Sequence, residues 1–536
     1  MEEVLDNNFD EIYPDIESTI KNATFISIDA EFTGIQSNDQ IKYSLFDTID
    51  DRYKLLKKNI DPFIIIQCGV AAFQHFPQQN TYRTKCYNFY LLPRPLPFKN
   101  RTFLLQVAAL EFLSIHNFDF NKSMHNGISY VDQIDEQLLR EYVEEGKFMS
   151  NLEHLSYHEE DVFKECKDKV EEWLVTPTNE ITYELATVTP ILQYMVHKEL
   201  RTHFKNIWTI SGNKSVIVIR VSEDMRRVYE EKRNVDLDKA LLDTYIGFSK
   251  IFKLLTSSKK PIIGHNILLD LMLMHQQFYK PLPKYYSEFK TNIHSLFPQL
   301  YDTKFLSSEF KKRISGDVNW KISSLRAIYE YLKLNKGKSL ALNSPHIKMH
   351  NISEDKEAYH TAGWDAYLAG YIFIKMGYLL TIQKYGEGLA LRPVTHTEIM
   401  SSVKQFANLI NLTRGNELYL KLDGHDPVYT RPEFLHVKLN TSPTSMKEIA
   451  EKFSPFGPID VMPFARKRVL VAVSNEKSVL NILAHFQNNQ EMQVAVYNPI
   501  KHAHPRKIVL WSSLILSSGV LAWMIQRVFK KSVTFD

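Results

Sequence analysis

Hydrophobic and polar residues alternate along residues 24–32, which read TFISIDAEF. In a strand, this alternation places Phe25, Ser27, Asp29 and Glu31 on one face and Ile26, Ile28, Ala30 and Phe32 on the other. The period therefore predicts a half-buried strand. The same reasoning predicts further elements: strands within residues 61–73, 85–92 and 261–263, and helices within residues 104–115, 133–145, 266–279 and 364–380. The first three strands would form an antiparallel meander.

The pattern changes between residues 161 and 240. Residues 181–204 predict mainly helix, residues 215–221 a strand and residues 223–233 a charged helix. These elements predict a small αβ module inserted into the first domain. Its basic residues are Lys198, Arg201, Lys205, Arg220, Arg226, Arg227, Lys232 and Arg233. They form either a solvated face or an RNA-facing patch, and the pattern does not decide between the two.

A third pattern occupies residues 434–497. Strands within 434–439, 459–462, 469–473 and 493–497 are interleaved with helices within 445–453 and 477–486. The resulting order, β-α-β-β-α-β, is typical of an RRM-like module.

Residues 508–525 read IVLWSSLILSSGVLAWMI and carry no charge. As a helix they would span about 27 Å, enough for a hydrocarbon core. Basic residues lie on both sides, and Trp511 and Trp523 lie near the two ends. A buried core helix could have the same length. The basic flanks favour a single-span tail anchor, with the preceding chain on the cytosolic side.

Composition narrows the class of protein. At about 150 residues per domain, 536 residues suffice for three or four domains. With 44% hydrophobic and 24% charged residues, a disordered chain is excluded. The net charge of +3 means that nucleic-acid binding would need local basic patches. Three cysteines, Cys68, Cys86 and Cys166, argue against a disulfide scaffold, and no Cys/His cluster has zinc-ligand spacing. The acidic N-terminal segment lacks the features of a signal or transit peptide.

Candidate chemistry begins with the carboxylates of the first strand. Asp29 and Glu31 would lie on the same face, where two like charges are unfavourable unless a cation lies between them. Taken alone, a solvated edge strand explains this pair more simply. Asp270 lies about one turn into an apolar helix, in GHNILLD. A carboxylate among such neighbours needs a partner.

His360 and Asp365 lie in HTAGWD. Five residues of ideal helix turn by about 500°, so the two would not share a helix face. Gly363 suggests that His360 lies on the preceding loop and that Asp365 projects from the first helical turn. The whole pattern, D-x-E … GHN-x3-D … H-x4-D, suits a two-metal phosphodiesterase. Oxygen ligands favour Mg²⁺ or Mn²⁺ over zinc, and histidine supplies a base near neutral pH.

This set resembles the DEDDh 3′-to-5′ exonucleases and, more closely, the poly(A)-specific ribonuclease family. The similar stretches are FISIDAEFTGI, YNFYLLPRPL, FDFNK with NGISY, GHNILLDLMLMHQQFYKPLP, YDTKFL and HTAGWDAYLAG. They cover most of residues 20–150 and 250–385. The resemblance implies an α/β fold of the ribonuclease H-like type. It also implies two Mg²⁺ ions, which Mn²⁺ could replace, held by Asp29, Glu31, Asp270 and Asp365.

The resemblance further implies His360 as the general base and RNA contacts at Phe32, Leu110 and Lys304. The expected domains follow: residues 1–160 and 241–395 form the exonuclease domain, 161–240 the inserted module, 396–500 the RRM-like module and 508–525 the transmembrane anchor.

Two departures from the family concern RNA binding. The insert lacks the Arg-x-x-x-His signature of the family's inserted domain, so its role stays open. The RRM-like strand RKRVLVAV is aliphatic, which favours packing or homodimerisation over base stacking.

A tail anchor is absent from the soluble deadenylase of the family, and in this feature the chain resembles a membrane-bound branch that matures PIWI-interacting RNA. This resemblance implies single-stranded RNA 3′ ends as substrates, PIWI protein–RNA complexes and a Tudor-domain scaffold as partners, and the mitochondrial outer membrane as the location. The endoplasmic reticulum is the alternative membrane. A membrane-tethered poly(A) mRNA deadenylase is the alternative enzyme. A catalytically inactive RNA-binding adaptor is the third hypothesis, and the intact set of five residues argues against it.

Overall fold

The computed structural model describes residues 1–502 except 38–40, 151, 153–154, 177–179, 213, 233–236, 314–323, 335, 351–358, 387–391, 429 and 441–444. The chain divides into two compact units. The first unit comprises residues 1–41, 53–412 and 419–426, and the second comprises residues 42–52, 413–418 and the described residues from 427 onward. Each unit is described by itself.

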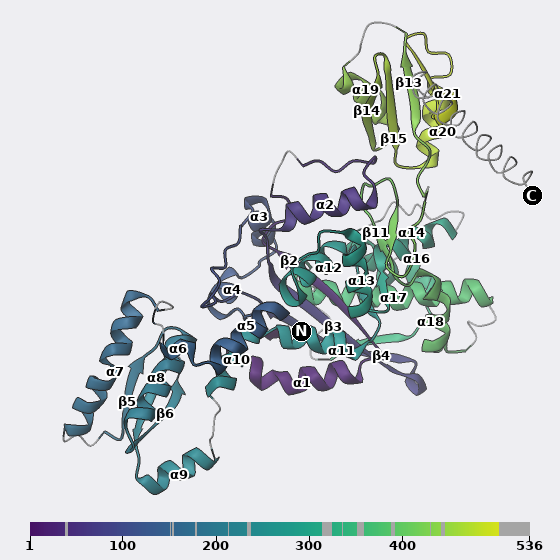
Figure 1. Cartoon of the computed structure of the whole chain (residues 1–536). Coiled ribbons are helices and arrows are strands. Elements are labelled where there is room, and N and C mark those ends of the chain that lie inside the picture. The colour runs from purple at the N-terminus through teal and green to yellow at the C-terminus, as the bar shows by residue number, and fades with distance from the viewer. Residues whose placement is uncertain are drawn as a thin grey trace, which may run out of the picture. The chain divides into compact units, whose positions relative to one another are not determined.

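The first unit is built on a seven-stranded sheet in the order β1-β4-β3-β2-β8-β9, with β10 paired to β4 (Figure 1). The strands are β1 (Glu2–Val4), β2 (Phe25–Phe32), β3 (Ile65–Phe76), β4 (Thr81–Tyr90), β8 (Ile262–Gly264), β9 (Leu300–Asp302) and β10 (His346–Met349). The predicted antiparallel meander is observed, because β3 pairs antiparallel with both β2 and β4. On the other side, β8 runs parallel to β2, and β9 runs parallel to β8.

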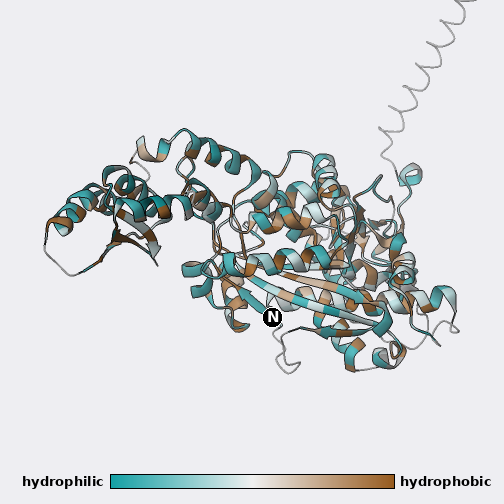
Figure 2. Cartoon of the chain, turned by 90° about the horizontal axis from the view of Figure 1, so that it is seen from below, coloured by the Kyte–Doolittle hydropathy of each residue, from teal (hydrophilic) through white to brown (hydrophobic). Residues whose placement is uncertain are grey.

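The first unit also contains helices, several of which contact the sheet. They are α1 (Phe9–Asn22), α2 (Ile49–Ile60), α3 (Val107–Ile115), α4 (Phe120–Asn126), α5 (Gln133–Glu144), α10 (Leu237–Ile246), α11 (Ser249–Ser258), α12 (Leu268–Met274), α13 (Tyr286–Leu296), α14 (Thr303–Arg313), α15 (Leu325–Leu334), α16 (Lys336–Leu340), α17 (Ala362–Tyr385) and α18 (His396–Val403). Short helical turns lie at η1 (Pro77–Gln79), η2 (His275–Tyr279) and η4 (Lys404–Phe406), and β11 (Leu409–Asn411) pairs with β12 (Tyr419–Lys421). Figure 2 shows hydrophilic and hydrophobic residues along many of the helices, as expected when one face of a helix is covered and the other is exposed.

The strand β2 is more buried than its alternating pattern predicts. Residues Phe25 to Ile28 are buried, so the expectation of a half-buried strand was wrong for its first half. The reason is that α17 covers the polar face: the Ser27 hydroxyl donates to the Ala366 carbonyl at 2.6 Å, and the Phe25 ring contacts Phe373. A small polar side chain with a hydrogen-bond partner can be buried without penalty.

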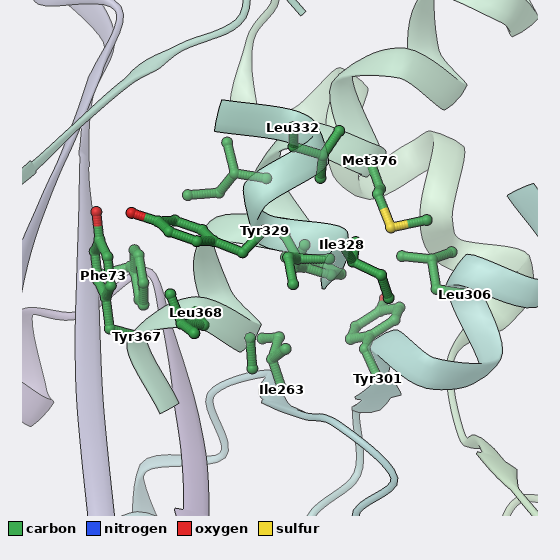
Figure 3. Packing of buried hydrophobic residues seen from close by; sticks show 14 of the residues in the cluster. Phe73, Ile263, Tyr301, Leu306, Ile328, Tyr329, Leu332, Tyr367, Leu368 and Met376 are labelled. Atoms are coloured by element: carbon green, nitrogen blue, oxygen red, sulfur yellow. The ribbon is translucent and has the colours of Figure 1, made fainter. Parts of the chain in front are cut away.

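The main core lies between the sheet and α17. Figure 3 shows part of it, in which Phe73 of β3 and Tyr301 of β9 pack with Tyr329 of α15 and Tyr367 of α17. The helix α17 is apolar over most of its length, and so its burial fixes the position of its first turn. This first turn carries Asp365.

The inserted segment has three strands in the order β5-β7-β6, in addition to helices. Its elements are α6 (Lys147–Ser150), α7 (Tyr157–Val175), β5 (Thr182–Ala186), α8 (Pro190–His203), β6 (Ile207–Gly212), β7 (Ser215–Arg220) and α9 (Glu223–Lys232). The prediction of helix over residues 181–204 was wrong at its start, where β5 forms. The helix begins only at Pro190. The Thr189 hydroxyl caps it by accepting a hydrogen bond from the Leu192 amide, and proline is favoured in the first turn of a helix.

Several basic residues of the insert serve its own packing. The guanidinium of Arg201 lies over the Trp208 ring at 4.0 Å, and that of Arg220 lies over Trp173 at 4.3 Å. Arg226 donates to the Arg201 carbonyl at 2.7 Å, at the end of α8. These three arginines therefore support the fold, which weakens the interpretation of the cluster as an RNA-facing patch.

The second unit contains the predicted β-α-β-β-α-β order in an antiparallel sheet, β14-β15-β13-β16. The elements are β13 (Leu435–Leu439), α19 (Met446–Phe453), η5 (Ser454–Phe456), β14 (Ile459–Ala465), β15 (Arg468–Val473), α20 (Glu476–His485), β16 (Met492–Val496) and α21 (Pro499–His502). The His502 ring lies parallel to the His436 ring at 4.1 Å, and Tyr497 packs on Phe464. These rings pack on one another within the module, and the expected role in packing or homodimerisation stays a prediction.

Two expectations concern the chain as a whole. The three cysteines are free and buried. Among residues 1–502, as far as the structure describes them, no helix is both long and apolar enough to cross a membrane. The predicted anchor at residues 508–525 lies outside the described residues.

Candidate active site

Three acidic side chains meet beside the central strand. Oxygen atoms of Asp29 and Glu31, on β2, and of Asp365, in the first turn of α17, all lie within 4.8 Å of one another. The prediction that Asp29 and Glu31 share a strand face is confirmed. So is the predicted placing of His360 and Asp365, because His360 precedes the helix and Asp365 lies in its first turn.

The start of α17 approaches the sheet closely because of three residues on β3 and β4. Gly69 lies opposite Asp29 in the β2–β3 pairing, and a Cβ at Gly69 would overlap the Ala362 backbone. The Gln67 side chain accepts a hydrogen bond from the Ala362 amide at 2.9 Å, and the Asn88 side chain accepts one from the Gly363 amide at 3.0 Å. The first amides of a helix have no partner within it, and these side chains supply partners.

Sequence reasoning missed Gln67 and Asn88. The available signal was a polar side chain between apolar or aromatic neighbours, as in IIQCGV and CYNFY, since a buried polar group needs a partner. Their effect is to hold the first turn of α17, and with it Asp365, against the sheet.

Asp270, on α12, is not one of the three residues whose oxygens lie within 4.8 Å of one another, but its charge acts on Asp29 and Glu31. It is buried, the backbone amide of Ala30 hydrogen-bonds to it, and burial followed by the charge of Asp302 raises its pKa to about 8. The helix expected over residues 266–279 is α-helical only to Met274 and continues as a π-helix, η2. The helix begins at Leu268, two residues later than the pattern predicted, so Asp270 lies within its first turn.

Asp302, at the end of β9, orders the loop that leads to Asp270. Its carboxylate accepts the backbone amides of Asn266 at 2.8 Å, of Lys304 at 2.9 Å and of Asn411 at 2.9 Å. Asn266 has a positive φ of 59°, which is uncommon outside glycine and needs such support. Sequence reasoning did not assign Asp302 a role, although it lies in the stretch YDTKFL.

Ionising all of these carboxylates at once costs free energy, because they are buried and their negative charges repel one another. Burial, and then Asp270, Asp365 and Glu31, raises the pKa of Asp29 well above its ordinary value, and burial, then Asp365 and Asp270, does the same for Glu31. Burial raises the pKa of Asp365 to about 7. A divalent cation would remove this repulsion, and oxygen-only donors suit a hard cation. The three gathered side chains, Asp29, Glu31 and Asp365, therefore fit a divalent-metal site, and Asp270 lies near enough for its charge to act on Asp29 and Glu31.

His360 lies beside this cluster. Its ring centroid is 3.8 Å from that of His116 and 5.0 Å from that of Phe112, both from the end of α3. Partial burial, followed by the charges of His116 and Arg326, lowers the pKa of His360 below its ordinary value. The neutral imidazole, which is the form able to accept a proton, is thereby favoured near neutral pH.

The residues predicted to contact RNA lie on elements that border the cluster. Phe32 ends β2 just after a register shift against β3. Leu110 lies on α3, which is tied to the same strand end because the Gln106 amide donates to the Thr33 carbonyl at 2.8 Å. Lys304 opens α14, and its burial lowers its pKa despite the opposing charge of Asp302. Their RNA contacts stay predictions.

Acidic oxygens gathered on a sheet strand, with a histidine at the edge, are the arrangement of a metal-dependent nuclease. The chain belongs to the CAF1 family of ribonucleases, whose family model matches residues 4–373. It is a 3′-to-5′ exoribonuclease, and the resemblance to poly(A)-specific ribonucleases is confirmed.

Three relatives illustrate the similarity. The chain is 33% identical to the pre-piRNA 3′-exonuclease trimmer of Bombyx mori, over 98% of this chain and 99% of that protein. It is 28% identical to the poly(A)-specific ribonuclease PNLDC1 of Mus musculus, over 97% of this chain and 98% of that protein. It is 30% identical to the poly(A)-specific ribonuclease PARN of Homo sapiens, over 89% of this chain and 77% of that protein.

Proposed function

We propose that this exoribonuclease is a Mg²⁺-dependent enzyme that shortens single-stranded RNA from its 3′ end and releases 5′-mononucleotides. Asp29, Glu31, Asp270 and Asp365 would hold two Mg²⁺ ions, which Mn²⁺ could replace. Bound Mg²⁺ would supply positive charge for the phosphodiester and for the attacking water. The neutral His360 imidazole accepts a proton from that water as the water oxygen bonds to phosphorus. The bond between phosphorus and the 3′ oxygen of the preceding nucleotide breaks, and that oxygen takes up a proton from solvent.

The proposed substrate is the 3′ end of a piRNA precursor bound to a PIWI protein. The observation that carries this proposal is the end-to-end similarity to the pre-piRNA 3′-exonuclease trimmer, which is the highest identity of the three relatives named above. The second candidate is a membrane-tethered poly(A) mRNA deadenylase. It is favoured by the similarity to the other two relatives, both of which are poly(A)-specific ribonucleases.

End-labelled RNA distinguishes these substrates. We expect stepwise loss of 5′-mononucleotides from an unstructured RNA, a poly(A) RNA and a PIWI-bound precursor, with the precursor shortened fastest. A 2′-O-methyl group on the last nucleotide should slow entry, because a pocket fitted to a free 3′ end and its 2′-hydroxyl would exclude the added methyl group. Internal cuts or 3′-monophosphate products would contradict the mechanism. A preference for poly(A) over the precursor would favour the deadenylase.

We further propose that residues 508–525 anchor the enzyme in the mitochondrial outer membrane, with the nuclease facing the cytosol. The stretch is short and interrupted by serines, and the basic Arg527, Lys530 and Lys531 follow it. Short, weakly hydrophobic spans suit thin membranes. Anchoring beside a Tudor-domain scaffold would raise the local concentration of the enzyme, so weak contacts with PIWI complexes could suffice.

A fluorescent protein fused to residues 501–536 tests this proposed location. We expect the fusion to coincide with a mitochondrial outer-membrane marker. As the matched control, Leu516→Arg places a charge in the middle of the span, which is costly in hydrocarbon, and should make the fusion diffuse. Reticular staining of the unmodified fusion would assign the protein to the endoplasmic reticulum instead, and diffuse staining would refute the predicted anchor.

A further inference from the structure

We propose that His116 is a positioning residue for His360, whose imidazole it holds in place by ring packing. The inference rests on the proposed role of His360 as the general base. It adds to that role a second residue, more than two hundred positions earlier in the chain, that touches the base and not the reacting atoms.

Three rings form a cluster at the edge of the site. The centroids of His116 and His360 are 3.8 Å apart with the rings inclined by 38°. Phe112 presents its ring edge-on to both, at 4.7 Å from His116 and 5.0 Å from His360. Phe112 and His116 are four residues apart at the end of α3, and such residues lie on the same side of a helix. The His360 ring is thus held by a single helix end.

This packing replaces the usual means of orienting a catalytic histidine. A general base is commonly oriented by a hydrogen bond to its second ring nitrogen. Among the residues that the structure describes, none hydrogen-bonds to the imidazole of His360, whereas its backbone amide bonds to Asp365. The ring contacts with Phe112 and His116 are therefore what restricts the rotamer of His360.

The backbone of His360 also needs support from outside its own loop. Its φ is +62°, a left-handed conformation that costs energy for any residue with a side chain. His116 is well placed to give that support, because it is the C-terminal cap of α3 and its amide bonds to the Leu113 carbonyl at 3.1 Å. Leu113 is itself buried. The support is thus anchored in the core.

The test uses the full-length protein with Mg²⁺ and a labelled single-stranded RNA, and it compares kcat and KM among variants. We expect His116→Ala to lower kcat about tenfold to a hundredfold, because a misplaced catalytic group loses its near-attack geometry. The KM for RNA should change little. His116→Phe should restore most of kcat, since a planar ring of similar size remains. Ile115→Ala, at an exposed position on the same helix end, is the control and should behave as wild type.

A double-mutant cycle separates this inference from the proposed function. If His360→Ala lowers kcat about 10²- to 10⁴-fold, His116→Ala should add no further loss in that background. Wild-type kcat in His116→Ala, an additive loss in the double variant, or failure of His116→Phe to restore kcat would overturn the role of His116. Wild-type kcat in His360→Ala would instead overturn the proposed base. Should His116→Ala lower the melting temperature, His116→Leu gives the same test, because leucine fills the space without a planar face.

Discussion

Asp29→Asn is expected to abolish cleavage while leaving the fold intact. Asparagine keeps the size of the side chain and removes the negative charge that a divalent cation would need at the centre of the cluster. The expected measurement is a single-turnover assay in which no mononucleotide is released above background at saturating Mg²⁺. Asp10→Asn, at an exposed position on α1, is the matched control and should retain full activity. Activity within threefold of wild type in Asp29→Asn would contradict the assignment of the site.

The same substitution should stabilise the metal-free protein at alkaline pH. Burial raises the pKa of Asp270 to about 8 and of Asp365 to about 7, so their folded-state values lie above those of the unfolded chain. A raised pKa contributes stability that is full at acidic pH and is lost as pH rises through the folded-state value. Removing one of the repelling carboxylates relieves part of this loss.

Thermal unfolding in a chelator measures this effect. We expect the melting temperature of Asp29→Asn to exceed that of wild type at pH 8 and to match it near pH 4. We also expect added Mg²⁺ to stabilise wild type more at pH 8 than at pH 5, because the ion competes with protons for the same oxygens. Equal melting temperatures at pH 8 would show that the carboxylates do not repel one another in the folded protein.

Local patterns predicted the parts of the site that lie within one element. Asp29 and Glu31 are two residues apart on a strand. Because side chains alternate between the two faces of a strand, this spacing was enough to predict that they share a face. Asp270 and Asp365 each lie in the first turn of an apolar helix, where an isolated carboxylate is conspicuous. The resemblance to a nuclease family then connected the three stretches, which no periodicity could do.

Contacts between distant segments could not be predicted in this way. The extended alternation of β2 suggests a solvated face, yet α17, more than three hundred residues later, buries it. The arginines of the insert looked like a surface patch because sequence shows charge but not stacking on Trp208 or Trp173. His116 likewise gave no signal, since its partner His360 is far away in the chain.

Gly69 is the clearest case of a long-range requirement, because the space available there depends on a helix from the other end of the domain. A side chain at this position would meet the backbone of Ala362 rather than a flexible side chain, so the start of α17 would have to move. That start carries Asp365, whose oxygen lies with those of Asp29 and Glu31. A displacement of the helix would therefore separate the carboxylates.

We expect Gly69→Ala to lower the free energy of unfolding by about 1–3 kcal/mol, as is usual for overpacking, and to lower kcat about a hundredfold. Gly377→Ala is the control: its Cβ would meet the Cγ2 methyl group of the buried, β-branched Ile399 at 2.7 Å, so it should also lose stability, but it lies about 18 Å along α17 from Asp365. It should retain activity. Urea unfolding and single-turnover cleavage measure the two quantities. If Gly69→Ala lost stability but kept wild-type kcat, the close approach of α17 would serve packing alone, and the position of Asp365 would not depend on it.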